Sequence, residues 1–255
     1  KGDSIILAAN KNVGFIFSYF AIHLIGAKAL PLDEQITVDR LNYVLEEAIP
    51  KLIIGLQNKT NDFNVISFDK LNDLEKSKIP SSIKFPNIDN DADIIFTTGT
   101  TGAPKGVVLT NKNIIESANN INSFIGNTSD DTELLAMPIS HSFGLARLRC
   151  VFSTGGSIVL LGSIVNMKRM FRIFDEHNIT GFGMVPSAWF YIKKMSGNKL
   201  AQYSDQLNYI ELGSAYMSAE EKRVLIEMFP KTRLCMHYGL TEASRSSFLE
   251  FNTEK

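Results

Sequence analysis

The sequence has few of the features that indicate metal, disulfide or membrane chemistry. Its 255 residues contain only two cysteines, Cys150 and Cys235, which stand far apart and outside any C-x-x-C spacing. We therefore expect no zinc site and no disulfide framework, and we predict buried free thiols in a reducing, cytoplasmic compartment. The longest apolar run, "VGFIFSYFAIHLIGAKAL", is interrupted by polar residues before it reaches the roughly 18 to 20 residues of a membrane span. This argues against a transmembrane helix.

An excess of either charge is also absent. Lysine and arginine total 26, aspartate and glutamate total 27, and the formal net charge is -1. A surface that binds nucleic acid normally needs a basic excess, so we expect no nucleic-acid partner and favour a small-molecule partner. A chain of this length can bury a core large enough to need no disulfide or metal support.

Short strand-like and helix-like segments alternate along the chain, which predicts an α/β fold. Helices are expected at about 13–25, 38–47, 111–124 and 218–228, where Ser218 and Glu221 form a candidate capping box. The turn-rich segment "GNTSDD" is the candidate boundary between a first lobe, residues 1–128, and a second lobe, residues 129–255. Strands are expected at 4–9, 27–32, 51–56, 92–98, 106–110, 133–137, 157–161, 181–185, 209–213 and 233–237.

The segment "TTGTTGAPKG" follows the strand expected at 92–98 and has the composition of a phosphate-binding loop. A Walker loop is excluded because Lys105 is followed by Gly106, and "GVVLT" after it is a strand pattern where that motif needs a helix. Glycines allow backbone amides to turn inward, hydroxyls can donate to phosphate oxygens, and a lysine adds a flexible positive charge. The residues concerned are Thr97, Thr98, Gly99, Thr100, Thr101, Gly102 and Lys105. A glycine-rich surface hairpin is the alternative.

The longer segment "FTTGTTGAPKGVVLTNKNI" resembles the phosphate-loop signature of the adenylate-forming superfamily. This superfamily comprises acyl-CoA synthetases, peptide-synthetase adenylation domains and firefly-type luciferases. Four further segments fall in the family's order, namely "MPISHSFGL", "MVPSAW", "ELGSAYMS" and "HYGLTEAS". The resemblance covers essentially the whole chain, and it implies two stacked αβα lobes with mostly parallel sheets.

The same resemblance implies a nucleotide site. The threonine and glycine loop, with Lys105, would hold the phosphates of ATP. One wall of the adenine pocket would be Gly213, Ser214 and Ala215, although Tyr216 stands where the family usually has proline. The implied roles of the "HYGLTEA" residues are base stacking by Tyr238, close backbone approach at Gly239, α-phosphate binding by Thr241 and Mg²⁺ binding by Glu242. Lys105, Thr241 and Glu242 are the expected catalytic residues.

The segment "MPISHSFGL" resembles the border of the family's acyl pocket, which makes His141, Phe143 and Gly144 the expected substrate-binding residues. Amino-acid-activating relatives place an aspartate near this point, and no such counter-charge is visible here. We therefore expect an AMP-forming acyl-CoA synthetase that uses ATP, Mg²⁺ and coenzyme A. An adenylation module that loads an acyl carrier protein, or a truncated nucleotide-binding protein without catalytic activity, remains an alternative.

Two further expectations concern a C-terminal lid domain and two arginines. The family continues past "SSFLEFNTEK" with a ribose-binding aspartate and a small lid domain that bears a lysine. We therefore expect this chain to lack the C-terminal lid domain and to have little or no activity alone. Arg147 and Arg149 could meet phosphates of CoA or of a carrier protein's phosphopantetheine, but surface ion pairing is the favoured interpretation.

Overall fold

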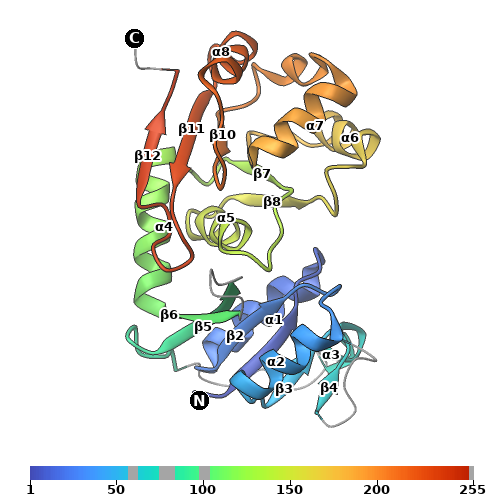
Figure 1. Ribbon diagram of the computed structural model, residues 1–255, viewed down its shortest axis with the longest axis vertical. Helices are drawn as coiled ribbons and strands as arrows, with labels where there is room; N and C mark the ends of the chain where they lie inside the picture. The colour runs from blue at the N-terminus through green and yellow to red at the C-terminus, as the bar shows by residue number, and fades with distance from the viewer. Residues whose placement is uncertain (57–62, 75–83, 98–103, 253–255) are drawn as a thin grey trace. The chain divides into compact units, whose positions relative to one another are not determined.

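The computed structural model describes residues 1–56, 63–74, 84–97 and 104–252 (Figure 1). The chain forms two compact units, of which the first comprises Lys1–Ile115 with Pro138–Ser142. The second comprises Glu116–Met137 with Phe143–Lys255. The chain therefore passes between the units three times, whereas the sequence suggested a single boundary between residues 128 and 129.

The first unit is built on a six-stranded sheet with the order β4-β3-β1-β2-β5-β6. All neighbouring pairs are parallel except β5 and β6, which run antiparallel. Its strands are β1 (Ser4–Ala8), β2 (Lys28–Leu32), β3 (Leu52–Ile54), β4 (Val65–Ile66), β5 (Asp91–Thr97) and β6 (Lys105–Thr110). Strands such as β1 read as continuous apolar runs because helices cover both faces of a parallel sheet.

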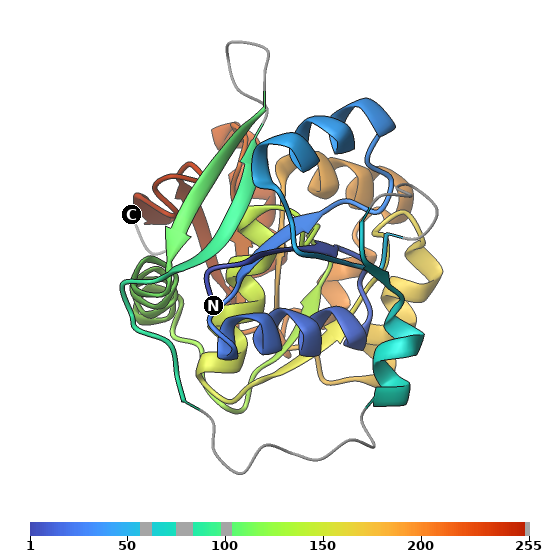
Figure 2. The same cartoon turned by 90° about the horizontal axis from the view of Figure 1, so that it is seen from below.

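The helices of this unit are α1 (Val13–Leu24), α2 (Val38–Ala48) and α3 (Phe68–Leu74), and α4 (Asn111–Ile125) begins in it. Figure 2 shows α1 and α2 on opposite faces of the sheet. The first turn of α1 is capped by Asn12, whose side chain accepts a hydrogen bond from the backbone N–H of Phe15.

A buried carboxylate ties α1 to the strand that leads into the phosphate loop. Asp93 of β5 is fully buried and accepts a hydrogen bond from the hydroxyl of Tyr19 at 3.0 Å. The Nε2 atom of His23 lies 2.9 Å from the other carboxylate oxygen. A buried charge needs such partners, and these two come from the same helix, so they fix the position of β5 against α1.

The second unit is built on a sheet with the order β12-β11-β10-β9-β7-β8, in which only the β11 and β12 pair is antiparallel. Its strands are β7 (Thr132–Leu135), β8 (Ser157–Leu160), β9 (Gly181–Met184), β10 (Tyr209–Leu212), β11 (Arg233–Tyr238) and β12 (Ser247–Glu250). Its helices are α5 (Ser142–Ser153), α6 (Met167–Glu176), α7 (Pro186–Ser196), the 3-10 helix η1 (Lys199–Tyr203) and α8 (Ala219–Met228). The predicted α/β class is confirmed.

The two faces of this second sheet differ in character. Side chains alternate between the faces of a strand, so Ile210 and Leu212 of β10 face one side and Tyr209 and Glu211 face the other. The first pair belongs to a large apolar core shared with α6, α7 and α8. On the other face, Tyr209 packs with apolar residues of α4 and α5. One face of the sheet therefore packs in a large apolar core, and the other face buries charge.

Both cysteines are buried and free, as predicted. Burial raises the pKa of Cys150 to about 11 and the pKa of Cys235 to about 12, so neither thiol forms a thiolate readily. Over the part of the chain that the structure describes, every helix is too short or too polar to cross a membrane.

Candidate functional site

Two predicted motifs meet at the carboxyl ends of neighbouring strands in the second unit. β10 and β11 are parallel and in register, with Leu212 beside Met236, so the segments that follow them emerge at the same edge of the sheet. That edge is where open α/β sheets bind ligands. The two segments line one pocket, whose wall includes Ser214, Ala215, Tyr216, Tyr238, Gly239 and Leu240. The structure therefore brings together the residues expected to form the adenine site.

Aromatic rings stand open at this pocket. Tyr238 is 67% exposed and Tyr216 is 85% exposed. An exposed ring can stack on a planar base without first losing protein contacts, which suits the role expected of Tyr238. Tyr216, which replaces the family's usual proline, adds a second aromatic surface to the same wall.

Gly213 is a glycine because a neighbouring ring occupies the space of a side chain. A Cβ atom built at Gly213 would lie 2.1 Å from both Cε1 and Nε2 of His237. His237 is buried and lies on β11, beside the strand that ends at Gly213. The His237 ring therefore packs directly on the backbone of the first residue of the expected adenine wall.

We expect Gly213→Ala to displace the His237 ring and to distort this wall. The free energy of unfolding should fall by about 1–3 kcal/mol, as is usual for overpacking, and AMP should bind more weakly. Urea unfolding and an AMP titration measure the two effects. Gly162→Ala is the control, since a Cβ at Gly162 meets no atom of the described residues within 4 Å. An unchanged AMP affinity in Gly213→Ala would contradict this role for the glycine.

The loop after Tyr238 is compact and presents two of the expected catalytic residues. The backbone N–H and C=O groups of Leu240 and Ala243 bond to each other at 3.1 and 3.2 Å, which closes a tight turn around Thr241 and Glu242. Thr241 is half-buried, and the Glu242 carboxylate is exposed. Glu242 has no hydrogen-bond or ion-pair partner among the described residues. Such a carboxylate fits Mg²⁺, which keeps several waters and needs one or two carboxylates beside substrate phosphates.

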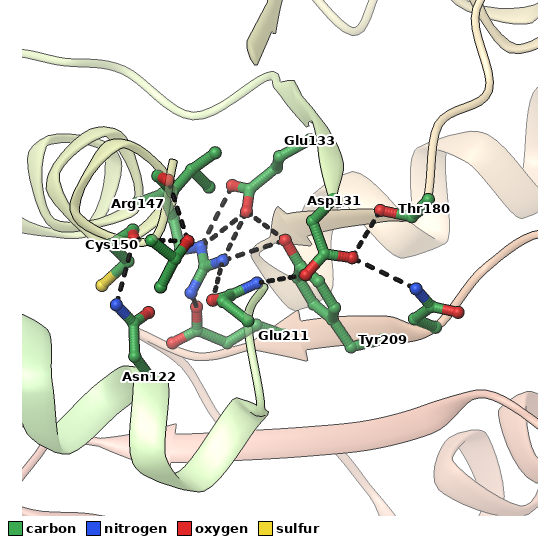
Figure 3. Close-up of polar contacts among 12 residues, drawn as sticks. Asn122, Asp131, Glu133, Arg147, Cys150, Thr180, Tyr209 and Glu211 are labelled. Carbon is green, nitrogen blue, oxygen red and sulfur yellow. Dashed lines mark hydrogen bonds and ion pairs between the residues drawn. The ribbon is translucent and has the colours of Figure 1, made fainter. Parts of the chain in front are cut away.

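A set of buried charged residues lies on the charge-bearing face of the same sheet (Figure 3). Arg147 of α5 is fully buried, so the expected surface ion pairing, and contact with CoA phosphates, is wrong for this residue. Its Nε atom donates to both carboxylate oxygens of Glu133, at 2.9 and 3.0 Å, and its Nη2 atom donates to Tyr209 at 3.0 Å. Its Nη1 atom lies 3.3 Å from Glu211. Burial alone would lower the pKa of Arg147, but Glu133, Tyr209 and Glu211 raise it well above its ordinary value.

Glu211 continues this set of charges toward the nucleotide motifs. Its carboxylate is fully buried on β10, within contact of Arg147, His237 and Arg245. Burial opposes ionisation, but the charge of Arg245, the hydrogen bond from His237 and the charge of Arg147 outweigh it and hold the pKa of Glu211 below its ordinary range. Sequence reasoning missed Glu211 and Arg245. A glutamate inside the apolar strand "YIELG" was the available signal, since a buried charge requires partners.

The expected phosphate loop lies in the sequence between β5 and β6, two antiparallel strands of the first unit. β5 ends at Thr97 and β6 begins at Lys105, and these two residues are cross-strand partners. The expectation that the loop leads into a strand is confirmed. Lys105 is exposed, and the hydroxyl of Tyr43 donates to the carbonyl of Pro104 at 3.0 Å, which anchors the base of the loop to α2. The other expected phosphate-binding residues lie outside the described residues, namely Thr98, Gly99, Thr100, Thr101 and Gly102.

The three expected substrate-binding residues are divided between the two units. His141 is exposed and lines a pocket of the first unit with Leu32, Phe96 and Ser140. Phe143 and Gly144 lie in the first turn of α5 in the second unit, and both are buried. The ring of Phe143 packs edge-on against His237, with 4.7 Å between the ring centroids.

Comparison with known families identifies the chain. A family model described as AMP-binding enzyme matches residues 1–255. The chain belongs to the AMP-binding enzyme family. Its curated relatives include a probable CoA ligase of Humulus lupulus, 27% identical over 96% of this chain and 49% of that protein. The 4-coumarate–CoA ligase 3 of Arabidopsis thaliana is 26% identical over 95% of this chain and 47% of that protein. This AMP-binding chain thus spans about half the length of these CoA ligases.

Peptide synthetases match over a similar share of the AMP-binding chain. Bacitracin synthase 3 of Bacillus licheniformis is 23% identical over 96% of this chain and 4% of that protein. The relatives therefore include both CoA ligases and peptide synthetases. They support an adenylate-forming ligase and leave the thiol acceptor open.

Solved structures share the fold. The N-terminal subdomain of NpsA from Klebsiella oxytoca, in complex with 3-hydroxybenzoyl-AMSN, has a TM-score of 0.87 and 18% identity, covering 99% of this chain and 64% of that chain. ATP-bound MatB from Rhodopseudomonas palustris has a TM-score of 0.86 and 21% identity, covering 99% of this chain and 52% of that chain. The architecture is that of adenylate-forming enzymes.

Proposed function

We propose that the pocket at the ends of β10 and β11 binds the adenine and α-phosphate of ATP, and that the protein activates a carboxylate as its acyl-adenylate. The observation that carries this proposal is the meeting of the "GSAY" and "YGLTEA" segments around one pocket, with the Tyr238 ring open for stacking. The family match over residues 1–255 supports it.

The proposed reaction has two steps, adenylation of the carboxylate and transfer of the acyl group to a thiol. A carboxylate oxygen of the substrate attacks the α-phosphorus of ATP, and pyrophosphate leaves with the electrons of the broken P–O bond. A thiol then attacks the acyl carbon, and AMP leaves while the thiol proton passes to solvent. The first step brings two anions together, so neutralisation and alignment are the main demands on the protein.

The residues of this chain can meet those demands. Thr241 is assigned to donate to the α-phosphate, and Lys105 is assigned to the β- and γ-phosphates. Glu242 would hold Mg²⁺ against the nucleotide, and the bound ion would neutralise phosphate charge as the anions meet. The fit rests on an exposed carboxylate that no described residue engages.

For the acceptor we propose coenzyme A, which makes the protein an AMP-forming acyl-CoA synthetase. The segment "HSFGL" carries no aspartate that could meet an α-ammonium group, so an acyl substrate without an α-amino group is favoured. His141, Phe143 and Gly144 are the assigned substrate residues. The peptide-synthetase relatives support the second candidate, an adenylation module that loads a carrier protein.

The proposal is tested by carboxylate-dependent exchange of pyrophosphate into ATP, measured on the complete protein with a panel of fatty and aromatic acids and of amino acids. Exchange with fatty or aromatic acids is expected, and a preference for amino acids would contradict the assigned pocket. Acyl transfer to CoA and to a carrier protein is then compared. Absence of exchange with every acid would overturn the proposed activity.

We expect Lys105→Ala to impair the use of ATP more than the use of the carboxylate. Loss of a charge-assisted hydrogen bond to phosphate corresponds to about a 10- to 100-fold rise in the KM for ATP. Lys112→Ala, which removes an exposed lysine from the first turn of α4, is the control. A raised carboxylate KM with unchanged ATP kinetics would refute the assignment.

A further inference from the structure

One buried carboxylate contacts both ends of the loop that carries the expected catalytic residues. Glu211 Oε1 lies 2.7 Å from Nδ1 of His237 and accepts a hydrogen bond from Nε of Arg245 at 3.1 Å. His237 immediately precedes Tyr238, and Arg245 immediately follows the segment that contains Thr241 and Glu242. The two ends of this loop therefore both lie beside Oε1 of Glu211.

The exit of the loop is held by more than this one contact. Arg245 is 8% exposed and has a backbone φ of 52°, a left-handed conformation that non-glycine residues adopt only when their surroundings hold them there. Its guanidinium carbon lies 4.7 Å from the centre of the Phe143 ring, and its Nη2 atom donates to the Phe143 carbonyl at 3.4 Å. Because these contacts fix the Arg245 side chain, they also hold the backbone at residue 245 in place.

The other end of the loop is fixed by the same carboxylate. The Nδ1 atom of His237 lies 2.7 Å from Oε1 of Glu211, so the carboxylate also holds the residue at the entry of the loop. The His237 ring in turn fills the space over Gly213, the first residue of the adenine wall. The second Glu211 oxygen lies 3.3 Å from Arg147, which fixes the carboxylate group itself.

We propose that Glu211 is a positioning residue of the nucleotide site, which clamps both ends of the 238–245 loop and so sets the places of Tyr238, Thr241 and Glu242. This inference rests on the proposed function for the site. Glu211 touches no substrate in this scheme and acts only through His237 and Arg245. A glutamine in its place would remove the negative charge that attracts Arg245, and its amide N–H₂ group would face either Arg147 or the pair of His237 and Arg245. The hold on the loop would weaken in either orientation.

The matched control is a second carboxylate of the same sheet. Glu133 of β7 is also fully buried and also pairs with Arg147, but its hydrogen-bond partners, Arg147 and Tyr209, lie outside the loop. Glu133→Gln should therefore destabilise the fold much as Glu211→Gln does, and should leave the loop in place.

The test compares the two variants in the complete protein by amide hydrogen exchange and by kinetics. In Glu211→Gln we expect at least tenfold faster exchange in residues 238–246 and about a tenfold rise in the KM for ATP, with the carboxylate KM unchanged, since small misplacements cost this much or more. General destabilisation lowers the folded fraction, and so the apparent kcat, without changing KM. In Glu133→Gln both loop exchange and the KM for ATP should match the unaltered protein.

Unchanged loop exchange and ATP KM in Glu211→Gln, or equal changes in Glu133→Gln, would overturn the clamp. If Glu211→Gln does not fold, Arg245→Met supplies the comparison, because it removes the partner of Glu211 at the exit of the loop and leaves Glu211 beside Arg147 and His237. The exchange measurement needs no nucleotide. A protein that fails to use ATP would therefore overturn the proposed function, while the loop exchange would still decide the clamp.

Discussion

Replacing Glu242 with glutamine is expected to lower the rate of adenylation about 10²-fold or more, the scale of several kcal/mol that Lewis-acid stabilisation supplies. The change keeps the size of the side chain and removes the charge that we assign to Mg²⁺. Acyl transfer from a supplied acyl-adenylate should fall much less, because that step releases AMP and has no pyrophosphate charge to neutralise.

Two half-reaction assays on the complete protein, each with Mg²⁺ titrated, measure this difference. Glu220→Gln removes an equally exposed carboxylate from the first turn of α8 and serves as the control. Equal losses in both half-reactions, or a loss that does not depend on the Mg²⁺ concentration, would mean that Glu242 shapes the pocket without holding the ion.

The second large effect is expected on stability. Arg147→Met should lower the free energy of unfolding by about 3–5 kcal/mol, because it leaves Glu133 and Glu211 as buried carboxylates without their shared cation. Methionine fills much of the same volume, so the loss reports charge more than packing.

Urea unfolding, followed by circular dichroism, measures this loss. Arg172→Met is the contrasting variant, since Arg172 is exposed and lies 3.9 Å from Glu176 in a surface pair worth about 0.5 kcal/mol or less. A loss below about 1 kcal/mol for Arg147→Met would show that the buried carboxylates find other compensation or take up protons.

Local patterns were enough to predict most of the strands. Apolar runs such as "SIILAA" and "ADIIFTT" become buried strands, because a parallel sheet covered on both faces leaves no polar side. The β-branched segment after Lys105 predicts the strand β6, which excludes a Walker loop. The strands β4 and β12 were missed because both are short and lie at the edges of their sheets.

The capping box predicted at the start of α8 forms only in part, because the side chain of Glu221 bonds to another helix. Ser218 does accept the hydrogen bond from the backbone N–H of Glu221, at 3.2 Å. The Glu221 side chain accepts instead from Nε1 of Trp189 at 2.9 Å and from Nζ of Lys193 at 3.0 Å. These partners lie on α7, so a tertiary contact replaced the local one.

The same limit applies to the candidate site. The motifs indicated which segments would line the proposed nucleotide pocket, and the segments after β10 and β11 do line one pocket, because each motif is continuous in the sequence. The set of buried charged residues joins Glu133, Arg147, Glu211 and Arg245, which come from four separate segments. A charge inside a strand indicates that a partner must exist, but only the fold determines which residue it is.

The position of Pro138–Ser142 in the first unit affects how the protein folds during its synthesis. It belongs to the first unit, yet it follows Glu116–Met137, which belongs to the second. As the chain leaves the ribosome, the first unit gains Ser140 and His141 only after part of the second has emerged. We therefore expect the first unit to complete its folding only while the second unit is also folding. An N-terminal fragment that ends at Ile115 would lack Ser140 and His141, so the wall of its pocket would be incomplete.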